Sequence, residues 1–423
     1  MAQIDAGVSL GATPDKPDSN LDEILQQAKK TLSTGDVAAT LDHLKPLASH
    51  PDVSDVDVVM ADLFFALGRQ KEGMQWLERA SAKDPKRMAI YLSFCEIAVR
   101  QQRWFDGWNL SRLGERMATP DHWSANLTER LKRRFTFLQG VCNEGRSDWT
   151  GARRDYETLR DEISSDSESS RRNILLGLAR CCVRLEDGEA AFAAITTLCE
   201  LDLKLSPPRQ LLAQIYEQSG MVEKADQAYR ENVGEASDAQ KELARLAYVR
   251  FLIYNNEPDK AEPLLRGEVG EAEESEKHDD RVLLQAILAR MQGRMDDARS
   301  LFSKIHRERP ESIVVANHLA AILVEDHDEA MRARALQIAE STVRNAPSSA
   351  DSWATLGWVR LRLGDTVAAE ASLVQSLKLG KPTRDTLYYL AKLNRATGKQ
   401  KEAEMFERLF ATSSGPNLFG NDE

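Results

Sequence analysis

The chain has 423 residues, of which 42% are hydrophobic and 29% are charged, with only 14 Pro and 23 Gly. This composition excludes a wholly disordered chain and favours helix over strand. The formal net charge of −11 argues against general nucleic-acid binding, because such binding needs a basic face that neutralises phosphates.

A recurring pattern of small residues runs along the chain. A small residue is followed, at fixed intervals, by a Gly and then by a second small residue. The pattern occurs at Ala61/Gly68/Gly73, Ala213/Gly220/Ala225, Ala286/Gly293/Ala298, Gly357/Gly364/Ala369 and Ala391/Gly398/Ala403, with a near match at Ala28/Gly35/Thr40. This spacing predicts pairs of antiparallel helices. The small residues lie where two helix backbones approach closely, and the Gly takes a positive φ in the turn.

Bulky residues and prolines complete the pattern. One position of the second helix is occupied by Leu77, Tyr229, Phe302 and Leu373, and by Leu44 in the near match. Prolines fall at the ends of several units, at Pro85, Pro310, Pro347 and Pro382. Because Pro cannot continue a helix, each of these is expected to separate one helix pair from the next.

The pattern resembles the tetratricopeptide repeat (TPR), a helical hairpin whose signature includes Leu-Gly, Tyr, Ala and a terminal Pro. The units Asp351 to Lys381, Arg384 to Phe410 and Pro207 to Val233 carry the resemblance best, and looser units fill most of the chain between Leu21 and Phe410. The resemblance implies an all-α, right-handed solenoid of about ten TPR-like helix-turn-helix units. It also implies a concave groove, lined by the first helix of each pair, that holds protein partners.

Breaks in the pattern divide the chain into segments. We expect a disordered N-terminal tail over 1–20, N-terminal repeats over 21–160, a polar linker over 161–172, central repeats over 173–266, an acidic loop over 267–280, C-terminal repeats over 281–410 and a flexible tail over 411–423. A long connection is expected near Ala118 to Arg134, where the spacing stretches. Within the polar tail, Leu418 and Phe419 are exceptions that either dock on the last helix or serve as a ligand for another protein.

Signals for targeting are lacking. Residues Met1 to Asn20 contain no basic segment followed by an apolar run, and no stretch is apolar over the length that a membrane span needs. The five cysteines include no C-x-x-C pair and are interpreted as buried, reduced thiols. We therefore expect a cytoplasmic protein.

Motifs for catalysis are also lacking. The chain has no P-loop, no G-x-G-x-x-G, no H-E-x-x-H and no G-x-S-x-G, and the repeats leave no room for a catalytic domain. We expect no enzymatic activity, no cofactor and no metal. His318 and His327 flank an acidic turn, but their spacing fits no metal-ligand pattern. Cys181 and Cys182 are adjacent, so they point in different directions on a helix and are interpreted as structural.

The groove of the last two units provides the candidate binding site. The repeat register places Trp358 and Arg362, then Tyr388, Lys392 and Arg395, on the concave face. Two aromatic side chains beside three cations suit an extended peptide with a carboxylate or acidic side chains. The alternative interpretation is an ordinary surface at the end of the array, whose charges serve solubility.

A second surface lies in the N-terminal third, which contains Trp76, Trp104, Trp108, Trp123 and Trp149. These tryptophans either form a partner-binding surface or belong to the core, and the helical spacing of Trp104 and Trp108 favours the core.

The function expected from these features is a non-enzymatic scaffold or adaptor that binds an extended peptide or a partner helix, without binding nucleic acid or inserting into a membrane. The alternative is a regulatory or sensor subunit that binds a small ligand or a transcription partner. Some TPR proteins grip a C-terminal carboxylate with paired Asn and cationic residues. Here Asn317 falls on the groove face, but Ala321 and Thr355 occupy the companion positions, so a chaperone-tail receptor is not expected.

Overall fold

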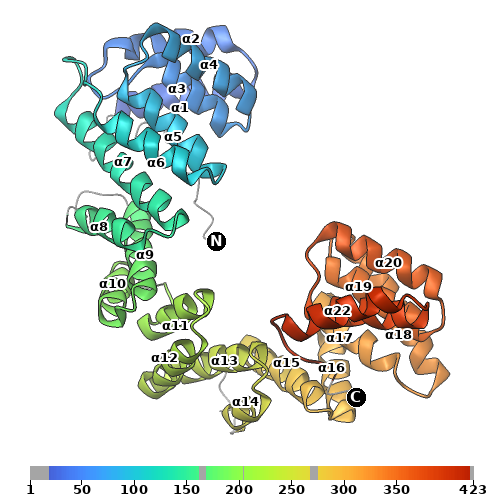
Figure 1. The fold of residues 1–423 in the computed structure, drawn as a ribbon. Coiled ribbons are helices and arrows are strands. Elements are labelled where there is room, and N and C mark those ends of the chain that lie inside the picture. Colours follow the sequence, from blue (N-terminus) through green and yellow to red (C-terminus); the bar gives the residue numbers. More distant parts are fainter. Residues whose placement is uncertain (1–18, 162–167, 203, 267–274, 420–423) are drawn as a thin grey trace. The chain divides into compact units, whose positions relative to one another are not determined.

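The computed structural model describes residues 19–161, 168–202, 204–266 and 275–419. Within these ranges the chain forms 22 α-helices and a short 3-10 helix, and contains no strand (Figure 1). The predicted all-α class is therefore confirmed. The chain divides into two compact units, Met1–Met221 and Val222–Glu423, which are described separately below.

The helices of the first unit are α1 (Ser19–Ser33), α2 (Val37–Leu44), the 3-10 helix η1 (Lys45–Ser49), α3 (Val56–Ala66), α4 (Gln70–Lys83), α5 (Met88–Arg100), α6 (Trp104–Glu115), α7 (Ala125–Gly145), α8 (Trp149–Arg160), α9 (Glu168–Arg184), α10 (Gly188–Leu201) and α11 (Pro208–Gln218). Those of the second unit are α12 (Val222–Glu235), α13 (Asp238–Tyr254), α14 (Pro258–Leu265), α15 (Ser275–Met291), α16 (Met295–Glu308), α17 (Ile313–Leu323), α18 (Glu329–Asn345), α19 (Ala350–Arg362), α20 (Thr366–Leu379), α21 (Arg384–Ala396) and α22 (Gln400–Thr412).

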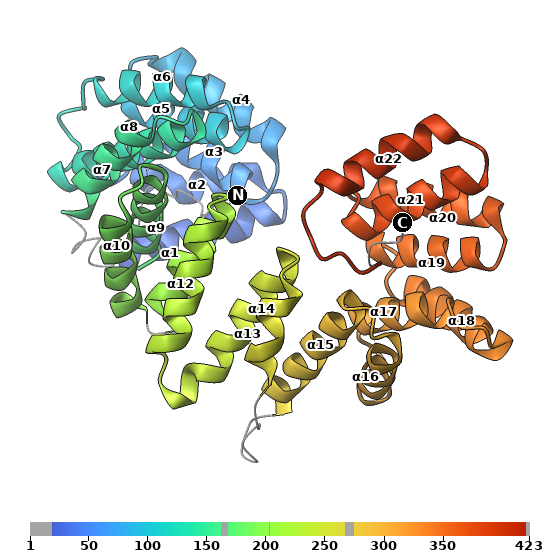
Figure 2. The ribbon, with the colours of Figure 1, turned by 60° about the horizontal axis from the view of Figure 1, so that its bottom comes forward.

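Consecutive helices pack as hairpins within each unit. In the first unit the pairs are α1 with α2, α3 with α4, α5 with α6, α7 with α8, and α9 with α10. In the second unit they are α13 with α14, α15 with α16, α17 with α18, α19 with α20, and α21 with α22. Neighbouring pairs also contact each other, as α8 with α9 and α18 with α19 do (Figure 2). This is the helix-turn-helix repetition that the sequence predicted.

The turns inside the pairs have the predicted backbone. Gly68 has φ +73°, and the Arg69 N–H donates to the Phe64 carbonyl over 2.9 Å, which satisfies one of the last carbonyls of α3. Positive φ is also found at Gly35, Gly220, Gly293, Gly364 and Gly398, so every Gly that the pattern placed in a turn has it. Looser units use non-glycine residues instead, namely Gln102, Ser147, Glu186 and Asn256. Asn adopts a positive φ more readily than most residues other than Gly, but Gln102, Ser147 and Glu186 carry no such signal in the sequence.

The small residues lie at close helix contacts, as predicted. A Cβ added to Gly357 in α19 would lie 2.7 Å from Leu373 Cγ in α20, and one added to Gly73 in α4 would lie 2.4 Å from Phe65 Cε1 in α3. Ala286 and Ala298 are fully buried in the pair α15–α16. Helix axes can approach this closely only where one side chain is small.

The connections between pairs match the predicted prolines but differ from the sequence prediction in one place. Pro85, Pro310, Pro347 and Pro382 all lie between pairs. The long connection predicted over Ala118 to Arg134 is wrong in its second half, because α7 begins at Ala125. The hydroxyl of Ser124 caps this helix by accepting from the Leu127 N–H over 2.9 Å, and Leu127, Leu131 and Phe135 recur on one buried face.

The other predicted segments fall partly outside the described residues. Residues 1–18 of the N-terminal tail, 162–167 of the polar linker and 267–274 of the acidic loop are not among them. Helices occupy the described parts: α1 begins at Ser19, α9 at Glu168 and α15 at Ser275.

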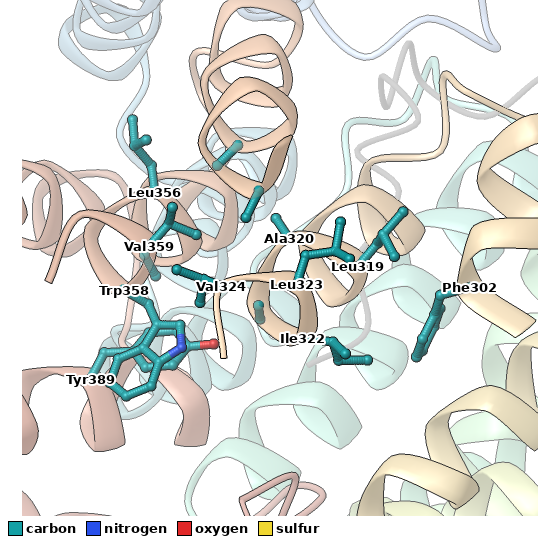
Figure 3. Packing of buried hydrophobic residues seen from close by; sticks show 14 of the residues in the cluster. Phe302, Leu319, Ala320, Ile322, Leu323, Val324, Leu356, Trp358, Val359 and Tyr389 are labelled. Carbon is teal, nitrogen blue, oxygen red and sulfur yellow. The ribbon is translucent and has the colours of Figure 1, made fainter. Parts of the chain in front are cut away.

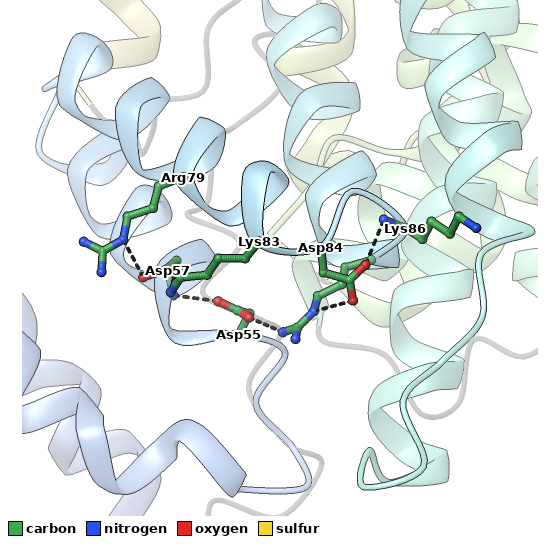
Figure 4. Close-up of polar contacts among 7 residues, drawn as sticks. Asp55, Asp57, Arg79, Lys83, Asp84 and Lys86 are labelled. Atoms are coloured by element: carbon green, nitrogen blue, oxygen red, sulfur yellow. Dashed lines mark hydrogen bonds and ion pairs between the residues drawn. The ribbon is translucent and has the colours of Figure 1, made fainter.

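In the first unit, an ion cluster joins the start of α3 to the end of α4. Asp55 caps α3 by accepting from the Asp57 N–H over 2.8 Å and is paired with Arg87 (Figure 4). Asp57 is buried and is paired with Lys83, and Arg79 lies 3.8 Å from the same carboxylate. These contacts hold the two ends of the hairpin together, since a buried carboxylate needs cationic partners.

The N-terminal tryptophans mostly serve this unit's core. Trp123 is 7% exposed and belongs to the core, while Trp76, Trp104 and Trp108 pack against it and stay half-buried. Arg146 lies over the Trp108 ring at 4.5 Å. The core interpretation therefore describes Trp123 best.

From α15 to α21, the core of the second unit runs through the repeats as one apolar cluster. Figure 3 shows Phe302 from α16, Leu319 and Leu323 from α17, Val359 from α19 and Tyr389 from α21 within it. Each helix pair contributes residues that its neighbours cover, which is how a repeat array builds a continuous core. The candidate site lies on this core.

Candidate functional site

A groove of about 1010 Å³ opens over the last helix pairs of the second unit, and we call it the C-terminal groove. Its walls come from the ends of α15, α16 and α17, from one face of α19 and α21, and from the segment after α22. The lining residues are Arg290, Met295, Asp296, Arg299, Ala321, Ile322, Glu325, Asp326, His327, Trp358, Leu361, Arg362, Tyr388, Lys392, Arg395, Ala396, Leu418 and Phe419.

All of the residues predicted as a binding site line this groove. Trp358 and Arg362 are one helical turn apart on α19, so they share a face. Tyr388, Lys392 and Arg395 share a face of α21 in the same way, and α19 packs beside α21. The repeat register thus predicted their proximity.

The two predicted aromatic side chains, Trp358 and Tyr388, do not contribute equally to the surface of the groove. Trp358 is only 5% exposed, and its ring stacks on Tyr389 with centroids 4.8 Å apart, so most of its surface belongs to the core. Tyr388 is half-buried, and the ring of Phe419 stacks on it at 4.0 Å and 6°. The sequence predicted that both aromatic rings would be available to a ligand. The structure instead buries Trp358 and covers Tyr388 with Phe419.

The three cations differ in their partners. Arg362 is paired with Glu325 at 2.6 Å, and Arg395 makes a two-bond pair with Glu407, with both distances 2.8 Å. Lys392 has no carboxylate partner in the part of the chain that the structure describes. Its ammonium lies 5.0 Å from the centroid of the Tyr388 ring. Of the three cations, Lys392 can therefore pair with an acidic ligand without first breaking an ion pair within the described residues.

A buried arginine forms the inner wall of the groove. Arg290 is 3% exposed, and its Nη1 donates to Nδ1 of His318 over 2.8 Å. Burial and the neighbouring Arg290 charge lower the pKa of His318 to about 3, so its imidazole is neutral and accepts this bond. Burial raises the pKa of the Asp385 carboxyl to about 6, although Arg290 opposes the shift and Asp351 adds to it. The hydrogen bond to His318 fixes the guanidinium in place.

The raised pKa of Asp385 predicts a pH-dependent substitution. Between pH 4 and 6 the folded chain keeps a proton on this carboxyl that the unfolded chain has lost, so its contribution to stability falls as pH rises through that window. Asp385→Asn mimics the protonated form. We expect it to raise the free energy of unfolding by about 2 kcal/mol at pH 7.5 and by about a third of that at pH 4.5. Urea unfolding of parent and variant at both pH values measures the difference. An equal gain at both values would contradict the assignment.

The segment after α22 lies against the second unit. The sequence predicted a flexible tail over 411–423, but α22 continues to Thr412 and the residues Ser413–Phe419 make defined contacts. Leu418 is 2% exposed, and Phe419 packs against the core of the last repeats. The docking alternative that the sequence left open is therefore observed, although Phe419 stacks on α21 and not on the last helix. Residues 420–423 lie outside the described part.

Sequence reasoning missed Arg290, Arg299 and the tail as parts of the groove. Arg290 and Arg299 lie in repeats before the last two, and no feature of their own segments points to α19 or α21. The two apolar residues in a polar tail, Leu418 and Phe419, were the only signal, and they did not indicate where the tail binds.

Other candidates for chemistry do not converge in the described residues. No group of three or more His, Cys, Asp and Glu side chains there is placed to hold a metal ion. Cys181 and Cys182 are buried, and burial raises the pKa of both thiols, which disfavours reactive thiolates. None of the described helices combines the length and the apolar character needed to cross a membrane.

Comparison with known proteins shows that the chain is similar to several solved structures. No protein-family model matches the chain, and no match was found among curated proteins. A tetratricopeptide repeat protein from Parabacteroides merdae is 17% identical, with a TM-score of 0.41, and the match covers 62% of this chain and 98% of that one. The yeast protein Tom70 is 10% identical, with a TM-score of 0.35, over 94% of this chain and 100% of that one. Cut9–Hcn1 is 14% identical, with a TM-score of 0.38, over 94% and 80%.

Similarities this low carry no conclusion about function, and the fold assignment rests on the chain's own geometry. Its helices pack as consecutive hairpins, each predicted turn glycine has a positive φ, and small residues lie at the helix contacts. The chain is therefore an all-α protein built from tetratricopeptide-like helix pairs.

Proposed function

We propose that the chain is a non-enzymatic, cytoplasmic scaffold or adaptor that binds a protein partner, and that the partner contributes an extended peptide to the C-terminal groove. The observation that carries the proposal is the convergence of Trp358, Arg362, Tyr388, Lys392 and Arg395 on one groove. Aromatic side chains offer contact area at low entropic cost, and cations pair with carboxylates. Nucleic acid and membrane are not proposed as partners.

The charge arrangement favours an acidic peptide. Lys392 is not neutralised by a carboxylate within the described residues, and it shares the groove with two ion pairs that are both partly exposed. Exposed ion pairs such as Arg362–Glu325 and Arg395–Glu407 contribute little to the free energy of folding. A partner's carboxylates can therefore replace Glu325 or Glu407 at a small cost in free energy. The groove can therefore offer up to three cations to a ligand.

Reversing the charge of Lys392 tests this proposal. A pull-down with the purified chain, followed by mass spectrometry, identifies the partner, and calorimetry then compares the parent with Lys392→Glu. We expect the variant to bind about 10-fold more weakly, or worse, at low salt. The difference should shrink as salt rises, because partly exposed charges are screened.

The matched control is Lys304→Glu, which changes the same residue type at an exposed position of α16 that does not line the groove. It should bind as the parent does, and circular dichroism should be unchanged for both variants. If Lys392→Glu binds the identified partner as tightly as Lys304→Glu does, the C-terminal groove is not the binding site. The tryptophan-rich N-terminal third is then the next surface to test.

A further inference from the structure

The residues after α22 occupy the C-terminal groove in the manner of a bound peptide. Ser413–Phe419 has no helix or strand of its own and contacts residues from three separate places, the turn between α13 and α14, the start of α21, and the groove wall. Its contacts divide into bonds to the main chain and burial of two side chains.

Main-chain contacts hold the first part of the tail. The Asn256 side chain donates from Nδ2 to the Gly415 carbonyl over 2.9 Å and accepts the Asn417 N–H at Oδ1. Arg384 Nη1 also donates to the carbonyls of Ser413 and Gly415, over 3.3 and 3.1 Å. Bonds to carbonyls and N–H groups do not depend on the tail's side chains, so this part of the surface would hold other peptides equally well.

Side-chain contacts hold the second part. Leu418 is 2% exposed and lines the groove. The Phe419 ring stacks on Tyr388 at 4.0 Å, has the Arg290 guanidinium 5.3 Å from its centroid, and meets the edge of Trp358 at 6.3 Å. An aromatic ring with a ring on one side and a buried cation near it gains both stacking and cation–π attraction. These two positions therefore select for a particular sequence.

We infer that Ser413–Phe419 is an intramolecular ligand of the C-terminal groove, and that the partner's peptide carries the same pair, Leu followed by an aromatic residue, with acidic residues after it. The inference rests on the proposed function and names its ligand. In the sequence, Phe419 is followed by Gly420, Asn421, Asp422 and Glu423, so this chain's own tail also has acidic residues after the pair. Partner and tail then compete for Tyr388 and the wall around it.

Competition with a tethered segment has a measurable consequence. A short tether holds its ligand at an effective concentration on the order of millimolar, so a free peptide binds only the fraction of molecules whose tail is released. Releasing the tail should raise the apparent affinity of a free peptide without changing any residue of the groove wall contributed by α15, α16, α19 or α21.

The test uses a fluorescently labelled peptide with the sequence of residues 413–423 and two full-length chains, the parent and the double variant Leu418→Ser/Phe419→Ser. Fluorescence anisotropy should show at least about 10-fold tighter binding to the double variant than to the parent. A second peptide, in which the Leu and Phe are both replaced by Ser, should not bind either chain. Equal affinity of the first peptide for both chains, or no binding to the double variant, overturns the inference.

Controls separate tail release from loss of structure. Leu409→Ser changes an exposed Leu on α22 that does not line the groove, and it should bind the peptide as the parent does. If the double variant loses its helical circular dichroism, the single variant Phe419→Ala repeats the measurement while Leu418 and the main-chain bonds remain. Tighter binding to Phe419→Ala than to Leu409→Ser supports the inference, and equal binding overturns it.

The inference and the proposed function fail in different ways. If the labelled peptide behaves as expected but the identified partner is insensitive to Lys392→Glu, the tail assignment stands and the proposed function at this groove fails. If the partner needs Lys392 but neither competes with the labelled peptide nor binds the tail-released chain more tightly, the inference is overturned and the proposed function stands.

Discussion

Replacing Arg281 with Ala should lower the free energy of unfolding of the Val222–Glu423 unit by about 3–5 kcal/mol, because it leaves a buried carboxylate without its main partner. The side chains of Arg281 and Glu242 are 4% and 9% exposed, and Arg281 Nη1 donates to Glu242 Oε1 over 2.8 Å. Arg281 Nη2 also donates to the Leu265 carbonyl at the end of α14, over 2.7 Å. One side chain thus joins α13, α14 and α15.

Urea unfolding followed by circular dichroism measures this loss, and Arg245→Ala provides a matched control. Arg245 lies 3.8 Å from the same Glu242 carboxylate, but its side chain is 37% exposed, so its removal should cost at most about 1 kcal/mol. The double variant Glu242→Leu/Arg281→Leu should recover most of the stability, because apolar residues of similar size replace both charges. If Arg281→Ala and Arg245→Ala lower the free energy of unfolding equally, burial of the Arg281–Glu242 pair does not determine its contribution to stability.

Gly357→Val should destabilise the same unit by about 2–3 kcal/mol, because the pair α19–α20 has no space for a side chain there. The new Cβ would lie 2.7 Å from Leu373 Cγ and 3.2 Å from the Ala369 carbonyl oxygen. Leu373 is fully buried, so it cannot move aside without disturbing the core. Since α19 also carries Trp358 and Arg362, the substitution should weaken peptide binding together with stability.

The contrasting change is Gly234→Ala in α12, where a new Cβ meets no atom within 4 Å. A Gly in a helix costs backbone entropy, so this change should leave the free energy of unfolding unchanged or raise it by up to about 1 kcal/mol. Thermal melting of both variants compares the two sites. If Gly357→Val melts at the same temperature as the parent, the close approach of α19 and α20 does not require a small residue at position 357.

The sequence by itself determined the features that repeat. Helix pairs, turn glycines and separating prolines recur with a fixed period, so each imperfect unit was supported by the better ones. The same period placed Tyr388 and Lys392 on the face of α21 that follows Trp358 and Arg362 on α19, and the groove residues were predicted for this reason. Turns without Gly, such as those at Gln102 and Glu186, escaped prediction because their positive φ is imposed by the neighbouring helices and not by the residue type.

Tertiary structure alone decided which of these residues remain available to a ligand. Glu325 and Glu407 neutralise Arg362 and Arg395, whereas Lys392 lies over the Tyr388 ring. Periodicity describes where a residue lies on its own helix. An ion pair or a stacked ring also depends on which side chains of distant segments pack against that residue. The bond between Asn256 and Asn417 is the extreme case, since it joins residues 161 positions apart and brings Phe419 onto Tyr388. No local pattern encodes such a contact, because it forms only after the intervening repeats have packed.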